Sequence, residues 1–432
     1  MKFTVIGGGS TYTPEFVDGL KDFVKEVPID ELYLMDINAE RLEIVGGLAK
    51  RIIENLGLKI KVNLTTNAEE AIKDADFIIT QIRVGGIRGR IKDEKVPLKH
   101  DLIGQETTGP GGFAMALRTI PVMLNYAKII EKYAKNAWWI NFTNPSGLVT
   151  EALARYSNTK VIGLCNIPIN ILKMFSEFYN VPVNKIFLDY IGLNHFSWVR
   201  KVYINGRDVL PEVIQMIEKN PELAEEFGSE IPSLYRMLPN YYLKYYWHKD
   251  IVLEKLKKAP KTRGEQVLEL EGYFLNLYKN PELKEKPADL DQKRGGRGYS
   301  EAALTLISAI YNDKNEIHIV NVPNQGAIEM FPKDAVAEIP CVVNKSGAHP
   351  IKLDPPEPEI RGLLHMVKSY ELLTAEAAVT GSYELALKAL MTHPLVLSYE
   401  KAKAVLDDLL IAHKDYLPQF KDKIEELLKE RK

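Results

Sequence analysis

The chain has 432 residues, of which 46% are hydrophobic and 26% charged, with 28 glycines and 24 prolines. This composition is that of an ordinary globular protein and excludes the collagen-like, coiled-coil and disordered classes. Because 56 basic residues nearly balance 58 acidic ones, giving a net charge of -2, no overall positive field favours nucleic acid or an anionic membrane, and we expect neither as a partner.

The N-terminus and the cysteines both favour a cytoplasmic protein. Residues 1–9 lack the shape of a secretion signal, and no stretch approaches the roughly 18 apolar residues of a membrane span. Two cysteines, Cys165 and Cys341, are too few for a disulfide framework. We therefore expect reduced thiols and a cytoplasmic location.

The first 165 residues alternate short β-branched stretches with amphipathic segments. This alternation is typical of βαβ units around a parallel sheet. We predict an α/β fold in which an N-terminal Rossmann-like, doubly wound parallel sheet precedes a C-terminal mixed α+β domain. The predicted N-terminal strands are 2–6, 31–36, 60–65, 76–82, 137–142 and 160–164.

The pattern changes near residue 190, and we place a domain boundary there, giving domains 1–190 and 191–432. The elements predicted around and after this boundary are a strand pair at 186–191 and 198–204, helices to about 280, strands within 316–343, and helices from about 358. The second domain is therefore expected to mix strands and helices.

A glycine turn, Gly7-Gly8-Gly9-Ser10, lies between the first strand and a helix for which we predict Thr13 as the N-cap. Glycines there let backbone N–H groups approach a pyrophosphate at the helix N-terminus. Asp36 ends the second strand, where a carboxylate binds ribose hydroxyls and favours NAD over NADP. The usual fingerprint has a third glycine where Tyr12 stands, so a plain tight turn is the alternative.

An arginine-rich segment, RVGGIRGR at 83–90, follows the fourth strand. We expect a mobile loop whose guanidinium groups suit a phosphate or carboxylate, and a solvated basic loop is an equally good interpretation. The segment NFTNPSG at 141–147 follows the fifth strand. Its polar side chains suit sugar or ribose hydroxyls, although a turn explains it equally well.

Cys165 ends the sixth strand and precedes a predicted helix, so the helix N-terminus or a nearby cation could lower the pKa of the thiol. Cys165 and His195 match no zinc-finger spacing. Together with substrate oxygens, the two would form an open catalytic metal site. Taken alone, a buried thiol and a core histidine are the better interpretation.

Seven segments in this order resemble the NAD-dependent glycosidases of glycoside hydrolase family 4, and the resemblance covers nearly the whole chain. The segments are GGGSTYTPE (7–15), RVGGIRGR (83–90), GQETTGPGGF (104–113), NFTNPSG (141–147), GLCNIP (163–168), GLNH (192–195) and RGGRGYS (294–300). The resemblance implies that domain 1–190 binds NAD and that domain 191–432 serves the substrate, the metal and oligomerisation.

The resemblance also implies roles for individual residues. They are NAD binding by Gly7, Gly8, Gly9, Ser10, Thr11 and Asp36; a divalent metal, usually manganese, at Cys165 and His195; and substrate recognition by Arg90, Asn144, Asn166 and Arg294. Asparagine after the metal-binding cysteine resembles the 6-phospho-β-glucosidases, because α-specific members tend to carry an aspartate that acts as the general acid. A phosphorylated disaccharide or β-glucoside is therefore the expected substrate, and a homodimer or homotetramer the expected assembly.

A proton-abstracting tyrosine of the family matches Tyr242 best, within a segment that holds four tyrosines at 240–246. A tyrosine-rich packing surface is the alternative. With an ordinary pKa of about 10, tyrosine is a poor base and would need a nearby cation.

The family is an exception to the two-carboxylate rule for glycosidases. The implied cycle removes hydride from C3, deprotonates C2, eliminates the aglycone from C1, adds water and returns the hydride, with no net oxidation.

Two other functions fit parts of the sequence. A 2-hydroxyacid dehydrogenase of lactate or malate type would use the arginine segment and His195, but it leaves Cys165 and the tyrosine segment unexplained. A dinucleotide-sensing protein would bind NAD without turnover. An assay of phosphoglucoside cleavage with and without NAD⁺ separates these possibilities from a family 4 glycosidase.

Overall fold

A computed structural model describes residues 1–228, 230–294 and 298–431. Its centre is a nine-stranded sheet in the order β13-β12-β11-β6-β5-β4-β1-β2-β3. The parallel strands are β1 (Lys2–Ile6), β2 (Glu31–Met35), β3 (Lys61–Thr65), β4 (Phe77–Thr80), β5 (Trp138–Asn141) and β6 (Lys160–Gly163). All six predicted strands are confirmed, with small shifts at their ends. The order 3-2-1-4-5-6 is that of a doubly wound Rossmann-like sheet, which binds ligands at its carboxyl edge.

Three strands from the C-terminal half extend this sheet in the antiparallel sense. They are β11 (Glu316–Pro323), β12 (Val336–Asn344) and β13 (Gly347–Pro350). The junction is the pairing of Asn321 on β11 with Gly163 on β6. The two halves of the chain thus share one sheet, and the boundary at residue 190 stays a prediction.

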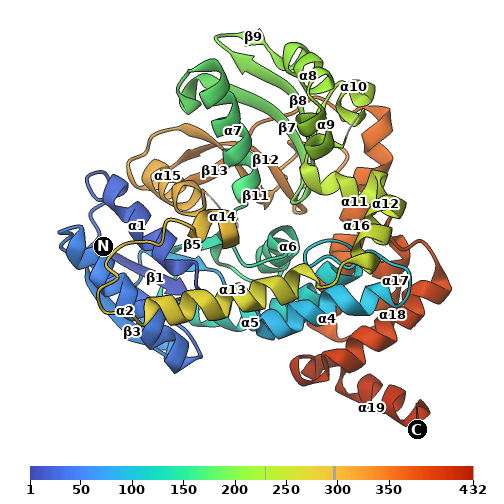
Figure 1. Cartoon of the computed structure of the whole chain (residues 1–432), viewed down its shortest axis with the longest axis horizontal. Helices are drawn as coiled ribbons and strands as arrows, with labels where there is room; N and C mark the ends of the chain where they lie inside the picture. Colours follow the sequence, from blue (N-terminus) through green and yellow to red (C-terminus); the bar gives the residue numbers. More distant parts are fainter. Residues whose placement is uncertain (229, 295–297, 432) are drawn as a thin grey trace.

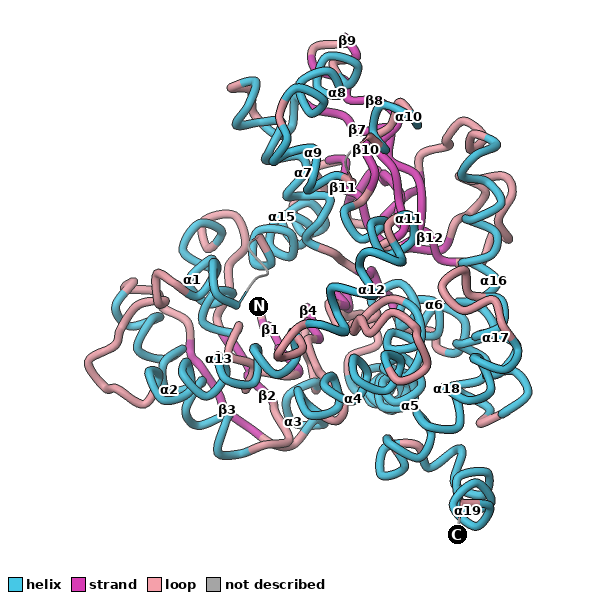
Figure 2. Tube along the Cα trace, turned by 45° about the vertical axis from the view of Figure 1, so that its right-hand side comes forward, coloured by secondary structure: helices cyan, strands magenta, loops and turns pink. Residues whose placement is uncertain are grey.

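A smaller, four-stranded antiparallel sheet contains β7 (Ile186–Leu193), β8 (Phe196–Ile204), β9 (Arg207–Asp208) and β10 (Leu238–Pro239). It includes the strand pair predicted near the boundary. In Figure 2 the labelled strands β7, β8 and β10 lie in the upper part of the molecule, next to β11 and β12. The two sheets are joined where Tyr190 of β7 donates a hydrogen bond of 2.5 Å to Glu338 of β12.

All the helices of the N-terminal half except the last pack around the parallel strands, and the last lies beside β7 of the smaller sheet (Figure 1). They are α1 (Thr13–Phe23), α2 (Ala39–Asn55), α3 (Ala68–Ile72), α4 (Gly86–Leu98), α5 (Gly109–Tyr133), α6 (Ser146–Tyr156) and α7 (Asn166–Tyr179). Tyr12, rather than the predicted Thr13, occupies the N-cap position of α1. The reason is that the Thr13 hydroxyl donates to the carbonyl of Gly8 at 2.9 Å, which ties the helix to the glycine turn.

The C-terminal half contributes a second set of helices, as predicted. They are α8 (Leu210–Lys219), α9 (Pro221–Phe227), α10 (Ile231–Tyr235), α11 (Lys244–Trp247), α12 (Lys249–Lys258), α13 (Arg263–Tyr278), α14 (Leu290–Arg294), α15 (Tyr299–Tyr311), α16 (Pro358–Thr380), α17 (Tyr383–Thr392), α18 (Tyr399–Ala412) and α19 (Lys421–Glu430). Among them, α13 crosses in front of α4 and α5 in Figure 1 and contacts both α4 and α2. Helix α13 therefore connects α2 and α4, which lie at the carboxyl edge of the parallel sheet.

Helix α5 is the longest helix in the described part of the chain, with 25 residues. By length and composition it is apolar enough to cross a membrane, a property that the sequence pattern did not predict. Within the fold, 61% of its most apolar window is buried. It packs against α4, α6 and α16 as a core helix.

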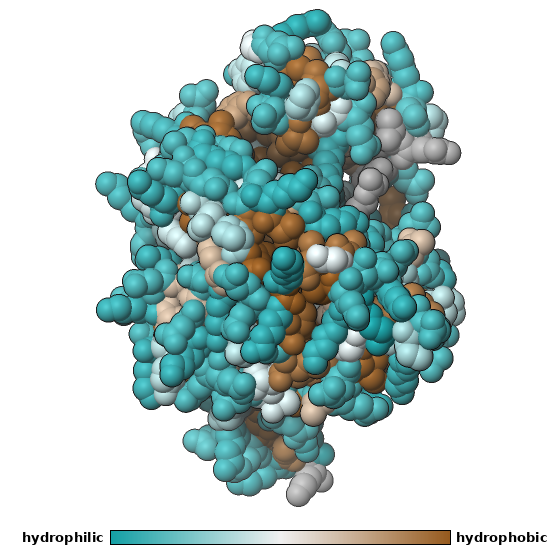
Figure 3. All heavy atoms as spheres, turned by 90° about the vertical axis from the view of Figure 1, so that its left-hand side faces the viewer, coloured by the Kyte–Doolittle hydropathy of each residue, from teal (hydrophilic) through white to brown (hydrophobic). Residues whose placement is uncertain are grey.

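The face seen from the left of Figure 1 is mostly hydrophilic (Figure 3). Hydrophobic side chains gather in a band through its middle, between hydrophilic upper and lower parts.

Candidate active site

A cavity of about 900 Å³ opens where β1, β2, β4, β5 and β6 end. The predicted site residues that line it are Gly7, Gly9, Ser10, Asp36, Arg90, Asn144, Cys165, Asn166, His195 and Tyr242. Two others lie behind its wall: Gly8 packs against Leu34, and the carbonyl of buried Thr11 accepts a hydrogen bond from Tyr278 at 2.7 Å. Arg294 ends α14, and its side chain lies outside the described part of the structure.

The glycine turn forms a cradle with no room for side chains. Gly7 has φ +94°, a conformation that favours glycine. A Cβ on Gly7 would lie 2.9 Å from the carbonyl oxygen of Gln81, and one on Gly9 would lie 2.9 Å from Oδ2 of Asp36. Bare backbone at a helix N-terminus is what close approach of a pyrophosphate requires, so the turn fits a dinucleotide.

Asp36 lies beside this cradle and is held by backbone donors. Its Oδ2 accepts from the N–H of Gly9 at 3.0 Å, and its Oδ1 accepts from the N–H of Asn38 at 2.9 Å. A carboxylate has about four lone-pair positions, so each oxygen retains capacity for one hydroxyl donor. The geometry fits a ribose diol.

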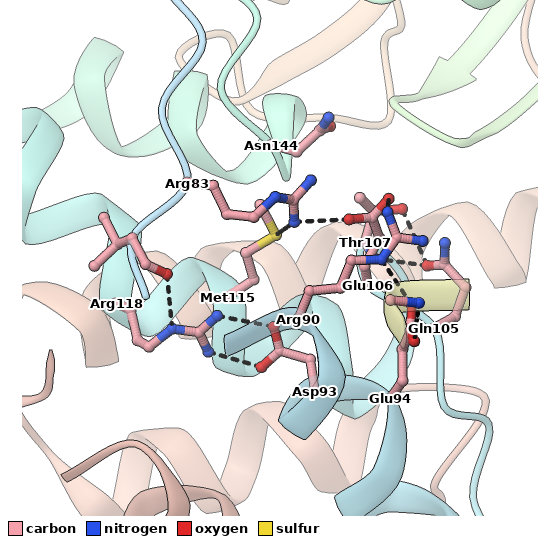
Figure 4. A network of polar contacts seen from close by, with 12 residues as sticks. Arg83, Arg90, Asp93, Glu94, Gln105, Glu106, Thr107, Met115, Arg118 and Asn144 are labelled. Carbon is pink, nitrogen blue, oxygen red and sulfur yellow. Dashed lines mark hydrogen bonds and ion pairs between the residues drawn. The ribbon is translucent and has the colours of Figure 1, made fainter. Parts of the chain in front are cut away.

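The arginine segment is more ordered than predicted (Figure 4). Instead of a mobile loop, its second half forms the start of α4, and Arg90 is only 7% exposed. Nη1 of Arg90 lies 2.8 Å from Oε1 of Glu106, and its Nε donates to Glu94 at 2.8 Å. Nη1 of Arg83 lies 2.7 Å from the other oxygen of Glu106. These carboxylates neutralise the guanidinium groups and fix their directions.

Glu106 is a central residue of the cavity to which the sequence interpretation gave no role. It follows Gly104 and Gln105 in the GQETTGPGGF segment, and only the three-dimensional structure brings it between Arg83 and Arg90. Its neighbour Thr107 places a hydroxyl 3.0 Å from Nδ1 of His195. In the sequence, the signal that could have pointed to Glu106 was a carboxylate within a glycine-rich segment.

Cys165 and His195 meet inside the cavity, with 3.5 Å between Sγ and Nε2. Cys165 follows β6, whereas His195 occupies the turn between β7 and β8 with a left-handed φ of 61°. Among the residues that the structure describes, no group of three or more His, Cys, Asp and Glu side chains forms a metal site. The 3.5 Å separation of the thiol and the imidazole fits two ligands of one metal ion, with substrate oxygens completing the shell as predicted from the sequence.

Burial controls the ionisation of both side chains. It raises the pKa of the Cys165 thiol, against the smaller opposing effects of the backbone N–H groups of Ile167 and Asn166. The helix N-terminus does lower this pKa, as expected, but burial outweighs it. Burial also lowers the pKa of His195 to about 4, so its imidazole is neutral at pH 7, which is the form that binds metals.

Tyr242 reaches the same point from a short 3-10 segment, Tyr241–Leu243, next to β8 and β10. Its ring stacks on the His195 imidazole, with the centroids 4.0 Å apart. Asn240 fixes the segment, because its Oδ1 accepts from the N–H of Tyr242 and its Nδ2 donates to Ser197 on β8. Loss of solvent around the hydroxyl raises the pKa of Tyr242 well above its ordinary value. The Glu106 carboxylate raises this pKa further, so ionisation of Tyr242 needs a cation at its hydroxyl.

A buried carboxylate supports this arrangement from behind. Glu338, on β12, is 0% exposed and accepts from Tyr190 at 2.5 Å, Asn194 at 2.9 Å and Asn321 at 3.1 Å. Asn194 directly precedes His195. The network therefore fixes the turn that carries the histidine, and the sequence pattern gave no sign of it.

Comparison with known proteins agrees with this geometry. Residues 2–181 match the family 4 glycosyl hydrolases, and residues 190–396 match the C-terminal domain of the same family. The chain belongs to this family. A protein named "probable 6-phospho-beta-glucosidase" of Bacillus subtilis (strain 168) is 46% identical over 98% of this chain and 99% of its own length.

Solved structures of family 4 relatives have the same fold. The 6-phospho-beta-glucosidase from Thermotoga maritima, solved with manganese, NAD⁺ and glucose 6-phosphate, superposes with a TM-score of 0.89 at 39% identity, covering 96% of this chain and 99% of its own.

A relative named for the other anomer, the 6-phospho-alpha-glucosidase of Leptotrichia buccalis, is 33% identical in sequence over 97% of this chain and 100% of its own.

The dehydrogenase likeness noted in the sequence extends to the fold alone. Malate dehydrogenase from Plasmodium falciparum superposes with a TM-score of 0.53 at 15% identity, covering 88% of this chain and 98% of its own.

Proposed function

We propose that this family 4 glycosidase hydrolyses 6-phospho-β-glucosides to glucose 6-phosphate and an aglycone. The observation that carries the proposal is one cavity lined both by the glycine cradle with Asp36 and by the cluster of Cys165, His195 and Tyr242. A hydrolase needs a dinucleotide site beside such a cluster only if the sugar is transiently oxidised. The names and bound molecules of the relatives from Bacillus subtilis and Thermotoga maritima support the same substrate class.

The reaction proceeds by oxidation at C3, deprotonation at C2, elimination of the aglycone, addition of water and reduction at C3. NAD⁺, when bound, supplies the hydride acceptor, and a divalent metal, most simply manganese, supplies stabilisation for negative charge on the neighbouring oxygens. The glycine turn and Asp36 would hold the first, and Cys165 with His195 the second.

Tyr242 is the base that takes the C2 proton. Its ring is fixed between His195 and the Asn240 cap, so its hydroxyl has a defined direction in the cavity. Because burial opposes ionisation of the phenol, a nearby cation must offset the cost of the phenolate. A metal ion held by Cys165 and His195 would supply that charge, because Arg90 is already paired with Glu94 and Glu106.

Arg90, Asn144 and Arg294 recognise the sugar phosphate and hydroxyls, with Asn166 beside the metal site. Arg90 is held by two carboxylates, so its remaining donors have a fixed direction toward the cavity. Asn166 is an amide and cannot be the carboxylic acid that the resemblance assigns to α-specific members. The greater identity to the β-specific relative, 46% against 33%, supports the same choice.

The decisive experiment measures release of the aglycone from a 6-phospho-β-glucoside by protein from which bound dinucleotide has been removed. We expect cleavage only when NAD⁺ is added, with no accumulation of NADH, because the hydride returns to the sugar. Full cleavage without NAD⁺ would contradict the proposal. Oxidation of a 2-hydroxy acid with accumulation of NADH would instead identify the alternative, a 2-hydroxyacid dehydrogenase.

The assembly and location belong to the same proposal. A homodimer or homotetramer is supported by the hydrophobic band of Figure 3 and by the frequency of closed homo-oligomers. A cytoplasmic location is supported by the two buried free cysteines. Light scattering of the purified protein tests the first, and fractionation of the producing cells tests the second.

A further inference from the structure

An ion pair closes the ribose end of the cavity. Arg41 of α2 lies against the glycine turn, where its Nε donates to the carbonyl of Gly9 at 3.2 Å. The other two guanidinium nitrogens donate to Glu271 of α13, Nη1 to Oε2 at 2.9 Å and Nη2 to Oε1 at 3.3 Å. Arg41, Glu271 and Asp36 all line the cavity.

This pair is close to Asp36 and largely shielded from water. A Cβ built on Gly9 would contact both the Asp36 carboxylate at 2.9 Å and the Cβ of Arg41 at 3.3 Å, so the three residues adjoin. The Glu271 side chain is 10% exposed and that of Arg41 is 29% exposed. Charge interactions here are screened less than on an open surface.

We propose that Glu271 is a specificity-determining residue that makes the dinucleotide site select NAD⁺ over NADP⁺, by occupying the guanidinium of Arg41. The inference rests on the proposed function, because it assumes that the glycine cradle binds a dinucleotide. It adds a second carboxylate, from a distant helix, to the one that the sequence pattern identified at Asp36.

The argument is one of charge and of donor geometry. An arginine near the ribose is the usual means of accepting a 2′-phosphate. Here the Arg41 fork is filled by Glu271, and the local charge of two carboxylates and one guanidinium is negative. A dianionic 2′-phosphate therefore meets repulsion and no free donor fork, whereas a neutral 2′-hydroxyl can still donate to Asp36.

The test compares the dissociation constants of NAD⁺ and NADP⁺ for the purified full-length protein, measured by displacement calorimetry without metal or sugar. In Glu271→Gln the amide keeps the shape but removes the charge. We expect NADP⁺ to bind about tenfold more tightly and NAD⁺ to change by less than about twofold, because only the phosphate carries charge at this edge. Glu54→Gln, an exposed change on the helix that carries Arg41, is the matched control and should leave both constants unchanged.

A second variant identifies the group responsible. Adding Arg41→Gln to Glu271→Gln should abolish the gain for NADP⁺. If Glu271→Gln does not fold, Arg41→Gln alone serves as the test, and it should weaken NADP⁺ more than NAD⁺ because Glu271 is left without its cation.

Parallel changes for both dinucleotides would overturn the inference, because they would mean that Glu271 only positions α13. An unchanged ratio of the two constants in Glu271→Gln would also overturn it. If the wild-type protein binds NAD⁺ but the ratio does not change in Glu271→Gln, the inference fails and the proposed function still stands. A wild-type protein that binds neither dinucleotide would refute the proposed function itself.

Discussion

The imidazole of His195 lies parallel to the phenol ring of Tyr242, with the two planes 3° apart and the centroids separated by 4.0 Å. The stack places the proposed base directly beside the proposed metal ligand. Because the pKa of His195 is lowered to about 4 by burial, the ring is neutral at pH 7 and does not itself stabilise a phenolate. That stabilisation must come from a cation, which a bound metal ion would supply.

Removal of the Tyr242 hydroxyl should stop the reaction and leave the dinucleotide site intact. We expect Tyr242→Phe to slow cleavage by about 100-fold or more, since positioned proton transfer contributes about that much. Turnover of the wild type in D₂O should place deuterium at C2 of the released glucose 6-phosphate, detected by NMR or mass spectrometry. Tyr242→Phe should lose the label together with cleavage, while calorimetry shows unchanged NAD⁺ binding.

Tyr311→Phe is the control for this substitution, because Tyr311 is 45% exposed on α15 and does not line the cavity. Product formed in D₂O with no label at C2 would favour a carboxylate mechanism, unless the base shields its proton from solvent throughout the cycle. Label retained in Tyr242→Phe would move the base to Tyr241, Tyr245 or Tyr246.

The two cysteines should differ sharply in their importance. Cys165→Ser and His195→Ala should each abolish metal-dependent turnover, because the chain supplies few metal ligands. Cys341, buried on β12 with its thiol donating to Ile339 at 3.5 Å, should tolerate alanine with little loss of activity. The measurement is the rate as a function of Mn²⁺ concentration after chelation. Unchanged rates after chelation and in both site variants would disprove the metal assignment, and a comparable loss in Cys341→Ala would reverse the two roles.

Arg90→Lys should reduce the preference for a phosphorylated substrate. Lysine keeps the positive charge, but its single ammonium group cannot bind both Glu94 and Glu106 and still offer two parallel donors to a phosphate. We expect kcat/KM to fall by about tenfold or more on the 6-phosphoglucoside, in line with a charge-assisted hydrogen bond, and by less on the unphosphorylated glucoside. Arg88→Lys, an exposed position on the same helix, is the control. Equal losses on both substrates would mean that Arg90 supports the fold or the cofactor.

Glu15 should make stability depend on pH near neutrality. It lies on α1 and accepts from the Ser300 hydroxyl at 2.7 Å, and burial raises its pKa from 4.5 to about 7. Because the folded-state pKa is the higher one, its contribution to stability is present below about pH 4.5 and is lost as the pH rises through 7.

In Glu15→Gln this dependence should disappear. The free energy of unfolding of the wild type relative to Glu15→Gln should fall by roughly 2 to 3 kcal/mol between about pH 5 and pH 8, at 1.36 kcal/mol per pKa unit. Urea unfolding at each pH measures it, with Glu43→Gln on α2 as an exposed control. A constant difference across this range would show that Glu15 titrates normally.

The parallel strands could be predicted because burial on both faces of a doubly wound sheet selects short β-branched stretches that stand out between amphipathic helices. The pairing of β11 with β6 could not be predicted. An apolar strand shows that it is buried but not which edge it joins, and Asn321 and Gly163 are far apart in the sequence.

The place of a candidate residue was predictable where it follows a single strand, as for Asp36 and Cys165, which both line the cavity. It was not predictable where partners meet from different elements, as for Glu106 between two arginines or Glu271 against Arg41. The pKa of Cys165 shows the same limit, because a helix start is visible in the sequence but the burial that outweighs it is a property of the fold.

The thiol of Cys165 and the imidazole of His195 belong to different sheets, one at the end of β6 and the other between β7 and β8. Their 3.5 Å separation therefore exists only when the two sheets have docked in the native register. A slip of one residue in either sheet would turn one donor away. Tight retention of a metal ion would thus report correct assembly of the whole molecule, which makes it a sensitive probe of refolding.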